Sequence, residues 1–318
     1  MNTMNRRDFI VQTVCVAALG AAGMSIPTWG DPLGLLIGIQ LCTVGADMQK
    51  DAPDTVARIA RIGYKEVETA GFGSTNTAAA LRKVLDDNGL RCPSALLIFG
   101  LKNINKAFDD AHALGCPYAT AVVPRLLITD LPAIWDAPAA ERQAVIQKIV
   151  AAADAPLSKD DLQKTIDAMN QVGAAAKQQG LIFGAHNHIA EFQSIDGRPA
   201  IEYMIEQTDP ASVKFEIDCG WAEVAGYSPV DIAAKYPGRI KMLHIKDFLP
   251  FEKGATVSGP NSPKGSEIGQ GVIDYKIIFA GMKGKGIEHI FVEQEGPFSR
   301  MPAVQSAEAD YRFLHSLV

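Results

Sequence analysis

The sequence predicts a (β/α)₈ barrel, or TIM barrel, of the α/β class. Three observations support this prediction: short apolar runs alternate with helix-patterned segments, eight such runs occur, and the length suits one barrel behind an N-terminal leader. Of the 318 residues, 47% are hydrophobic and 21% are charged, as in a globular protein with a large core. A net charge of −6 disfavours a nucleic-acid partner, because duplex binders need a basic surface.

The leader comes first along the chain. Arg6 and Arg7 precede the apolar run 11–24, which is too short to span a membrane and follows a positive region, as in an export signal. The pair resembles the bacterial twin-arginine (Tat) signal. We therefore expect residues 1–30 to be a Tat export signal, cleaved between Ala21 and Gly30. Residues 31–318 are then expected to form a single barrel domain in the periplasm, without stable membrane insertion.

Eight apolar runs rich in β-branched and aromatic residues are predicted as the barrel strands. In chain order they are Leu35–Leu41, Tyr64–Glu68, Leu90–Leu97, Tyr118–Val123, Leu181–His188, Val213–Ile217, Ile240–His244 and Ile290–Glu293. A doubly wound sheet is the alternative fold. It normally has fewer strands and a glycine-rich first turn, which is absent here.

Helices are predicted between these strands because capping residues or prolines open each helix-patterned segment. These signals are Asp51-Ala52-Pro53, Thr75-Asn76, Ser158-Lys159-Asp160, Ser228-Pro229 and Ile273-Asp274. Several of the helices are expected to end at a glycine that leads into the next strand. Those glycines are Gly63, Gly89, Gly115, Gly180 and Gly286. Strand, helix and glycine thus repeat in the order that a barrel requires.

Polar side chains gather where the predicted strands end, which is the functional face of such a barrel. They are Glu68, His186, His188, Asp218, His244 and Glu293. Residues i and i+2 of a strand share a face, so Glu216 points with Asp218, and Glu295 with Glu293. Carboxylates and imidazoles that converge in an apolar mouth repel one another and lose solvation unless a cation is present. A mixed His/Asp/Glu set suits Mn²⁺, Zn²⁺, Co²⁺ or Fe²⁺, and we expect one such ion.

The cysteines suggest neither disulfides nor a zinc-thiolate site. Cys42, Cys92, Cys116 and Cys219 remain after the leader, and none forms a paired spacing. All four fall in or beside predicted core strands, where a thiol behaves as a small hydrophobic group.

Several motifs resemble the sugar phosphate isomerase/epimerase family, the xylose-isomerase-like barrels, over roughly residues 35–318. The motifs are Ile39–Val44, Gly63–Glu68, Phe183–His188, Phe215–Asp218, Tyr236–Arg239, His244–Asp247 and Phe291–Gln294. The resemblance implies a barrel with a divalent ion at its mouth. Members of this family include inosose dehydratases, ketose 3-epimerases and enzymes that process 3-keto-glycosides. The His-x-His motif at His186 resembles the dehydratase-like branch.

The resemblance also implies roles for individual residues. Asp218, His244 and Glu293 match three family metal ligands. The fourth family ligand, often a glutamate on the fifth strand, falls at His186, and His188 or Glu191 are the alternatives. Glu68 matches a glutamate on the second strand that usually faces the substrate. Glu191 and Gln40 are expected to contact the substrate.

These groups suit the removal of a proton next to a carbonyl, because a divalent ion stabilises the enediolate charge. In the epimerases of the family, two glutamates share the proton transfer. His186 leaves that pair incomplete, so we expect elimination from a keto sugar, keto-inositol or 3-keto-glycoside. Glu68 or His188 is the expected acid or base, and Lys246 is expected to polarise a substrate oxygen.

Three other functions remain open at this stage. One is a ketose epimerase or isomerase of the same family, and another is an exported sugar-binding protein without catalysis. The third is a nuclease of the endonuclease IV type, which the acidic charge and the leader disfavour. Bound metal separates the classes: one ion favours the isomerase-family enzyme, several zinc ions the nuclease, and none the binding protein. The expected partner is a small carbohydrate, and the sequence leaves a homo-oligomer open.

The leader yields a first prediction. Replacing Arg6 and Arg7 by lysines should trap the protein in the cytoplasm with its leader attached, because a receptor recognises the arginine pair. Fractionation followed by N-terminal mass analysis measures this. Unchanged export of the variant would indicate another pathway.

Overall fold

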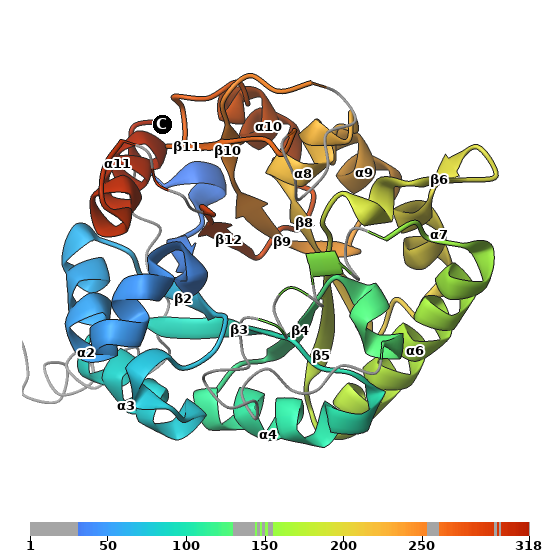
Figure 1. Cartoon of the computed structure of the whole chain (residues 1–318), viewed down its shortest axis with the longest axis horizontal. Helices are drawn as coiled ribbons and strands as arrows, with labels where there is room; N and C mark the ends of the chain where they lie inside the picture. Colours follow the sequence, from blue (N-terminus) through green and yellow to red (C-terminus); the bar gives the residue numbers. More distant parts are fainter. Residues whose placement is uncertain are drawn as a thin grey trace, which may run out of the picture.

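The computed structural model describes residues 31–129, 155–252, 261–295 and 300–317, together with positions 144, 147, 150, 151 and 298. Within this part of the chain, parallel strands close into a barrel in the order β1-β12-β9-β8-β5-β4-β3-β2 (Figure 1). The strands are β1 (Ile37–Gln40), β2 (Glu66–Thr69), β3 (Arg91–Leu97), β4 (Tyr118–Val122), β5 (Ile182–His186), β8 (Val213–Asp218), β9 (Ile240–Ile245) and β12 (His289–Val292). The expected barrel is confirmed and the doubly wound alternative is wrong. The expected export signal lies outside the described residues.

Helices surround the barrel, as the ring of coiled ribbons in Figure 1 shows. They are α2 (Gly45–Ile62), α3 (Ala78–Asp87), α4 (Ile104–Leu114), α6 (Lys159–Gln178), α7 (Ala200–Gln207), α8 (Cys219–Val224), α9 (Pro229–Lys235), α10 (Tyr275–Met282) and α11 (Ala303–His315). Two small antiparallel pairs add to them: β6 (Ser194–Ile195) with β7 (Arg198–Pro199), and β10 (Asp247–Phe248) with β11 (Gly265–Ser266). No described helix has both the length and the apolar character needed to cross a membrane.

The capping residues act largely where the sequence predicts them. The side chains of Ser158, Ser228 and Asp274 accept hydrogen bonds from the first turns of α6, α9 and α10. Asp51 breaks the helical dihedrals inside α2, and its Oδ1 accepts the Asp54 N–H at 3.0 Å. The expected start at Thr75 is two residues early, because Thr77 caps α3. Local hydrogen bonding therefore fixes most helix starts.

Apolar side chains fill the barrel below its carboxyl end. Tyr118, Met242 and Phe291 form a buried cluster inside the barrel. The Phe291 ring needs the space beside Gly38 on β1, where a Cβ atom would lie 2.6 Å from Phe291 Cδ1 and 2.8 Å from the Ile290 oxygen. This packed layer supports the polar residues above it.

We predict that Gly38→Ala lowers the free energy of unfolding by about 1–3 kcal/mol, because the added methyl overpacks the barrel interior. Gly45→Ala is the matched control, since nothing lies within 4 Å of its added Cβ and its backbone is right-handed helical. Thermal denaturation measures both variants. Equal melting temperatures would contradict the packing argument.

Candidate metal centre and active site

Four side chains that could hold a metal converge at the carboxyl end of the barrel. His186 ends β5, Asp218 ends β8, His244 lies in β9, and Glu293 follows β12. One ligand atom from each lies within 4.8 Å of those of the other three, and all four residues are buried. Strand register brings them together, because these parallel strands are neighbours in the barrel and all end on the same side.

Burial and neighbouring charges shift the pKa values of the quartet residues in different directions. Burial, reinforced by His244 and His188, holds the pKa of His186 well below its usual range, so this ring is neutral. Burial raises the pKa of Glu293, but Lys246 and His244 outweigh it and bring the net pKa well below its usual range. Burial also raises the pKa of Asp218, with Lys246 opposing part of the shift.

Lys246 is the cation inside this cluster. Its ammonium is almost fully buried, and Nζ lies 2.7 Å from Glu293 Oε2, 3.1 Å from Asp218 Oδ2 and 3.1 Å from Glu295 Oε1. The Tyr275 hydroxyl holds the Lys246 backbone, accepting its N–H at 2.7 Å and donating to its carbonyl oxygen at 2.6 Å. Burial lowers the pKa of Lys246, but the three carboxylates raise it further, so the amine stays charged.

Two carboxylates lie behind the histidine rings. His244 Nε2 is 2.7 Å from Glu68 Oε2 and 3.2 Å from Glu216 Oε2, and none of the three residues is exposed. Burial lowers the pKa of His244, but Glu216, Glu293 and Glu68 together raise it well above its usual range. The ring is therefore protonated in the metal-free protein, and a bound metal would displace a proton.

The residues fit a divalent metal on two further observations. Asp218 Oδ2 is buried and accepts no hydrogen bond of good geometry from the described residues, although Lys246 Nζ is near. Three carboxylates, those of Asp218, Glu293 and Glu295, face the single ammonium of Lys246. With both histidines neutral, as metal ligation requires, two negative charges remain unmatched among these four groups, without counting Glu68 and Glu216. One divalent cation neutralises them, and the mixed nitrogen and oxygen donors suit Mn²⁺, Zn²⁺ or Co²⁺.

A cavity of about 160 Å³ reaches the quartet at His186 and Glu293. Its walls include Gln40, Cys42, Leu96, Val122, His186, His188, Glu293 and Glu295. His188 Nε2 lies 3.9 Å from Glu295 Oε1, while His188 Nδ1 is buried and has no hydrogen-bond partner among the described residues. The cavity therefore places an imidazole and a second carboxylate beside the potential metal ligands His186 and Glu293.

Some residues predicted from the sequence lie outside this cavity. Glu68 was expected to face the substrate, but it is fully buried behind His244 and accepts a hydrogen bond from Ser94 at 2.5 Å. Lys246 was expected to reach a substrate oxygen, yet three carboxylates surround its ammonium. Glu191 accepts the His188 backbone N–H at 2.9 Å and fixes that loop. Gln40 lines the cavity as expected.

Three site residues received no role from the sequence. Strand periodicity put Glu216 on the same face as Asp218, and Glu295 on the same face as Glu293. That shared face is the signal that could have identified both as site residues. Cys42 was expected to behave as a core thiol, but it is exposed, lines the cavity and donates a hydrogen bond from Sγ to Glu293 Oε1 at 3.1 Å. It follows β1, where the chain turns out of the barrel into a short 3₁₀ helix (Leu41–Val44).

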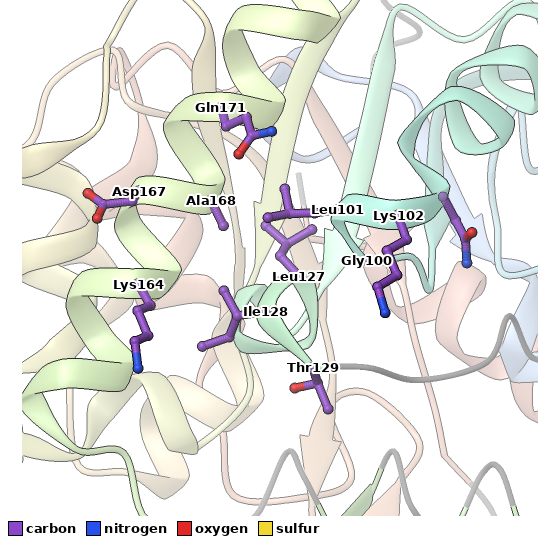
Figure 2. Close-up of a pocket in the computed structure, with 11 residues that line it drawn as sticks. Gly100, Leu101, Lys102, Leu127, Ile128, Thr129, Lys164, Asp167, Ala168 and Gln171 are labelled. Atoms are coloured by element: carbon purple, nitrogen blue, oxygen red, sulfur yellow. The ribbon is translucent and has the colours of Figure 1, made fainter.

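A larger pocket of about 770 Å³ lies away from the quartet. Figure 2 shows Lys164, Asp167 and Gln171 of α6 on one side and the segments around Leu101 and Ile128 on the other. None of the predicted site residues lines it. His186, His188, Glu293 and Glu295 line the smaller cavity, which we take as the candidate active site.

Comparison with known families agrees with this architecture. The family described as "Xylose isomerase-like TIM barrel" matches residues 56–317. The chain belongs to this family, whose sugar-processing barrels the sequence motifs resemble.

Individual relatives are distant. An inosose dehydratase from Geobacillus kaustophilus (strain HTA426) is 23% identical over 204 residues, which cover 60% of this chain and 60% of that protein. Alignments with such curated relatives span about half of their length. A sugar phosphate isomerase/epimerase structure from Parabacteroides distasonis ATCC 8503 superposes with a TM-score of 0.67 at 24% identity, covering 93% of this chain and 97% of that one. The IolI protein, solved with a bound zinc atom, gives a TM-score of 0.64 at 13% identity, covering 89% and 98%.

We predict that Asp218→Ala, His244→Ala and Glu293→Ala each lose bound divalent metal while the barrel persists, because the quartet lies above the packed layers. Elemental analysis after purification measures the metal, and far-ultraviolet circular dichroism measures the fold. Asp87→Asn, on the exposed surface of α3, is the control and should keep its metal. Full occupancy in any two of the three variants would refute the ligand assignment.

Proposed function

We propose that this protein is a divalent-metal-dependent lyase that removes a proton next to the carbonyl of a keto sugar, keto-inositol or 3-keto-glycoside and eliminates the neighbouring substituent. The observation that carries the proposal is the cavity itself. Its wall includes His186 and Glu293, two members of the quartet with Asp218 and His244, and His188 lines the same cavity. The sugar-processing family and its inosose dehydratase relatives support a small carbohydrate as the substrate.

The bound metal would supply positive charge that stabilises the negative charge developing on the substrate oxygen. The cavity groups of this chain perform the other tasks. Gln40, nearly fully buried in the wall, presents an amide to a sugar hydroxyl. The small volume of about 160 Å³ excludes most water from the reacting carbon.

His188 is the proposed base. Its ring lines the cavity, and the Glu191 carboxylate fixes its backbone. The C–H bond next to the carbonyl breaks, and its proton passes to the His188 ring. Glu295, at 3.9 Å from His188 Nε2, stabilises the imidazolium that forms, as a carboxylate does for other catalytic histidines.

The same proton completes the elimination. The imidazolium of His188 returns it to the departing hydroxyl or glycosidic oxygen as the C–O bond breaks, which yields water or an alcohol and an unsaturated product. An epimerase needs a second base on the opposite face of the substrate. By the family resemblance, His186 occupies the position of that second base, and because it would be held by the metal its lone pair is not available for proton transfer.

Lys246 and Glu68 then act on the ligands and not on the substrate. The Lys246 ammonium balances the charges of Asp218 and Glu293. Glu68 orients the His244 ring from behind. The proposed site of action is the periplasm, which rests on the twin-arginine leader.

This proposal predicts the outcome of incubating the metal-loaded protein with 3-keto-glycosides, keto-inositols and free ketoses in D₂O. Nuclear magnetic resonance should show that one of these substrate classes gives an eliminated or cleaved product. Epimers should not interconvert, because proton transfer occurs on a single face of the substrate. His188→Ala should lower the elimination rate by about 100-fold or more while it keeps the metal. His112→Ala, on the exposed face of α4, is the matched control.

Each alternative predicts a different result in the same experiment. Rapid interconversion of free ketose epimers without any eliminated product would reject elimination in favour of epimerisation. Binding of a sugar without any turnover by the metal-loaded protein would indicate a binding protein instead.

A further inference from the structure

Glu216 occupies an unusual position between two proposed metal ligands. Its Oε2 lies 2.9 Å from His186 Nδ1 and 3.2 Å from His244 Nε2, and the two imidazole centroids are 4.4 Å apart. Its Oε1 has no hydrogen-bond partner among the described residues, and the side chain is fully buried. One carboxylate therefore lies against the rear nitrogen of both rings.

The register of the sheet enforces this contact with His186. His186 on β5 and Glu216 on β8 are direct partners across neighbouring parallel strands. Both are nearly fully buried, so neither side chain can turn away into solvent. The side chains at positions 186 and 216 must therefore be able to form a hydrogen bond with each other.

A histidine at position 186 satisfies this match. An N–H at Nδ1 donates to Glu216, and the lone pair of Nε2 is then free for a metal in the quartet. A glutamate at position 186 has no N–H and would bring a further buried carboxyl group against Glu216, which already lies beside Glu68. Glutamine has nearly the shape of glutamate, but its amide can donate to Glu216 and present its oxygen to the metal.

We infer that Glu216 is a positioning residue that fixes the orientation of His186 and makes position 186 selective for a hydrogen-bond donor over a carboxylate. This inference rests on the metal site of the proposed function. It adds a reason for the departure of this chain from the glutamate that the family resemblance leads one to expect. The ligand at position 186 then depends on Glu216, its partner on the neighbouring strand.

The test compares His186→Glu with His186→Gln, first with Glu216 present and then combined with Glu216→Leu. With Glu216 present, the metal-free glutamine variant should melt at a higher temperature than the glutamate variant and bind Zn²⁺ more tightly, by about 10-fold or more. With Glu216→Leu the melting difference should shrink, because the buried carboxylate that repelled the glutamate is gone, and the order of Zn²⁺ affinity should reverse, because a charged carboxylate binds the ion better than an amide oxygen. Calorimetry measures melting, and competition with a chelator measures Zn²⁺ affinity.

Glu66→Leu is the matched control, because this buried glutamate of β2 pairs with Arg91 and His289 and not with His186 or Glu216. The preference for glutamine at position 186 should persist in that background. A preference that persists with Glu216→Leu, or that is lost with Glu66→Leu as well, would overturn the inference.

Two further results are informative. Glu216→Gln, which keeps the volume, should weaken Zn²⁺ binding by about 10–100-fold, since one amide oxygen cannot serve both rings equally. Unchanged affinity would also count against a positioning role. Failure of the proposed function would show instead as a wild-type protein that binds no divalent metal, while the melting order of the metal-free variants would remain measurable.

Discussion

The buried ammonium of Lys246 is the interaction on which the active end of the barrel depends. It lies within 3.1 Å of carboxylate oxygens from Asp218, Glu293 and Glu295, which belong to the ends of two different strands. Charges removed from water are costly unless opposite charges lie beside them. The ends of β8, β9 and β12 are therefore held together electrostatically.

The site is organised as layers along the barrel axis. An apolar cluster around Phe291 fills the interior and gives the strands a rigid base. Above it, Glu68 and Glu216 contact the rear nitrogens of the histidine rings. The quartet follows, and the cavity with His188 lies on top. Each layer supports the next, so the side chains that line the cavity are held by groups that lie behind them.

The direction in which the site residues point follows from the sequence, but their depth in the barrel does not. Strand periodicity predicted that Glu68, His244 and Glu293 point into the barrel, and they do. It could not predict depth along the axis, because depth depends on the stagger between neighbouring strands. Glu68 therefore lies behind His244 and outside the cavity, although both end predicted strands. The sequence could not predict the ionic partners of Lys246 either, because they come from β8 and from the segment after β12.

The sequence by itself determined the barrel, the order of its strands, most of its helix caps and the group of residues at its carboxyl end. These features follow from local rules: apolar periodicity, capping side chains and glycines such as Gly115, whose φ of 73° ends α4. Only the tertiary structure decided which of those residues share a cavity and which lie behind it. Closure of the barrel sets the register between strands, and register placed Glu216 against His186. A contact of 2.9 Å between residues thirty positions apart is a property of the closed sheet and not of either segment.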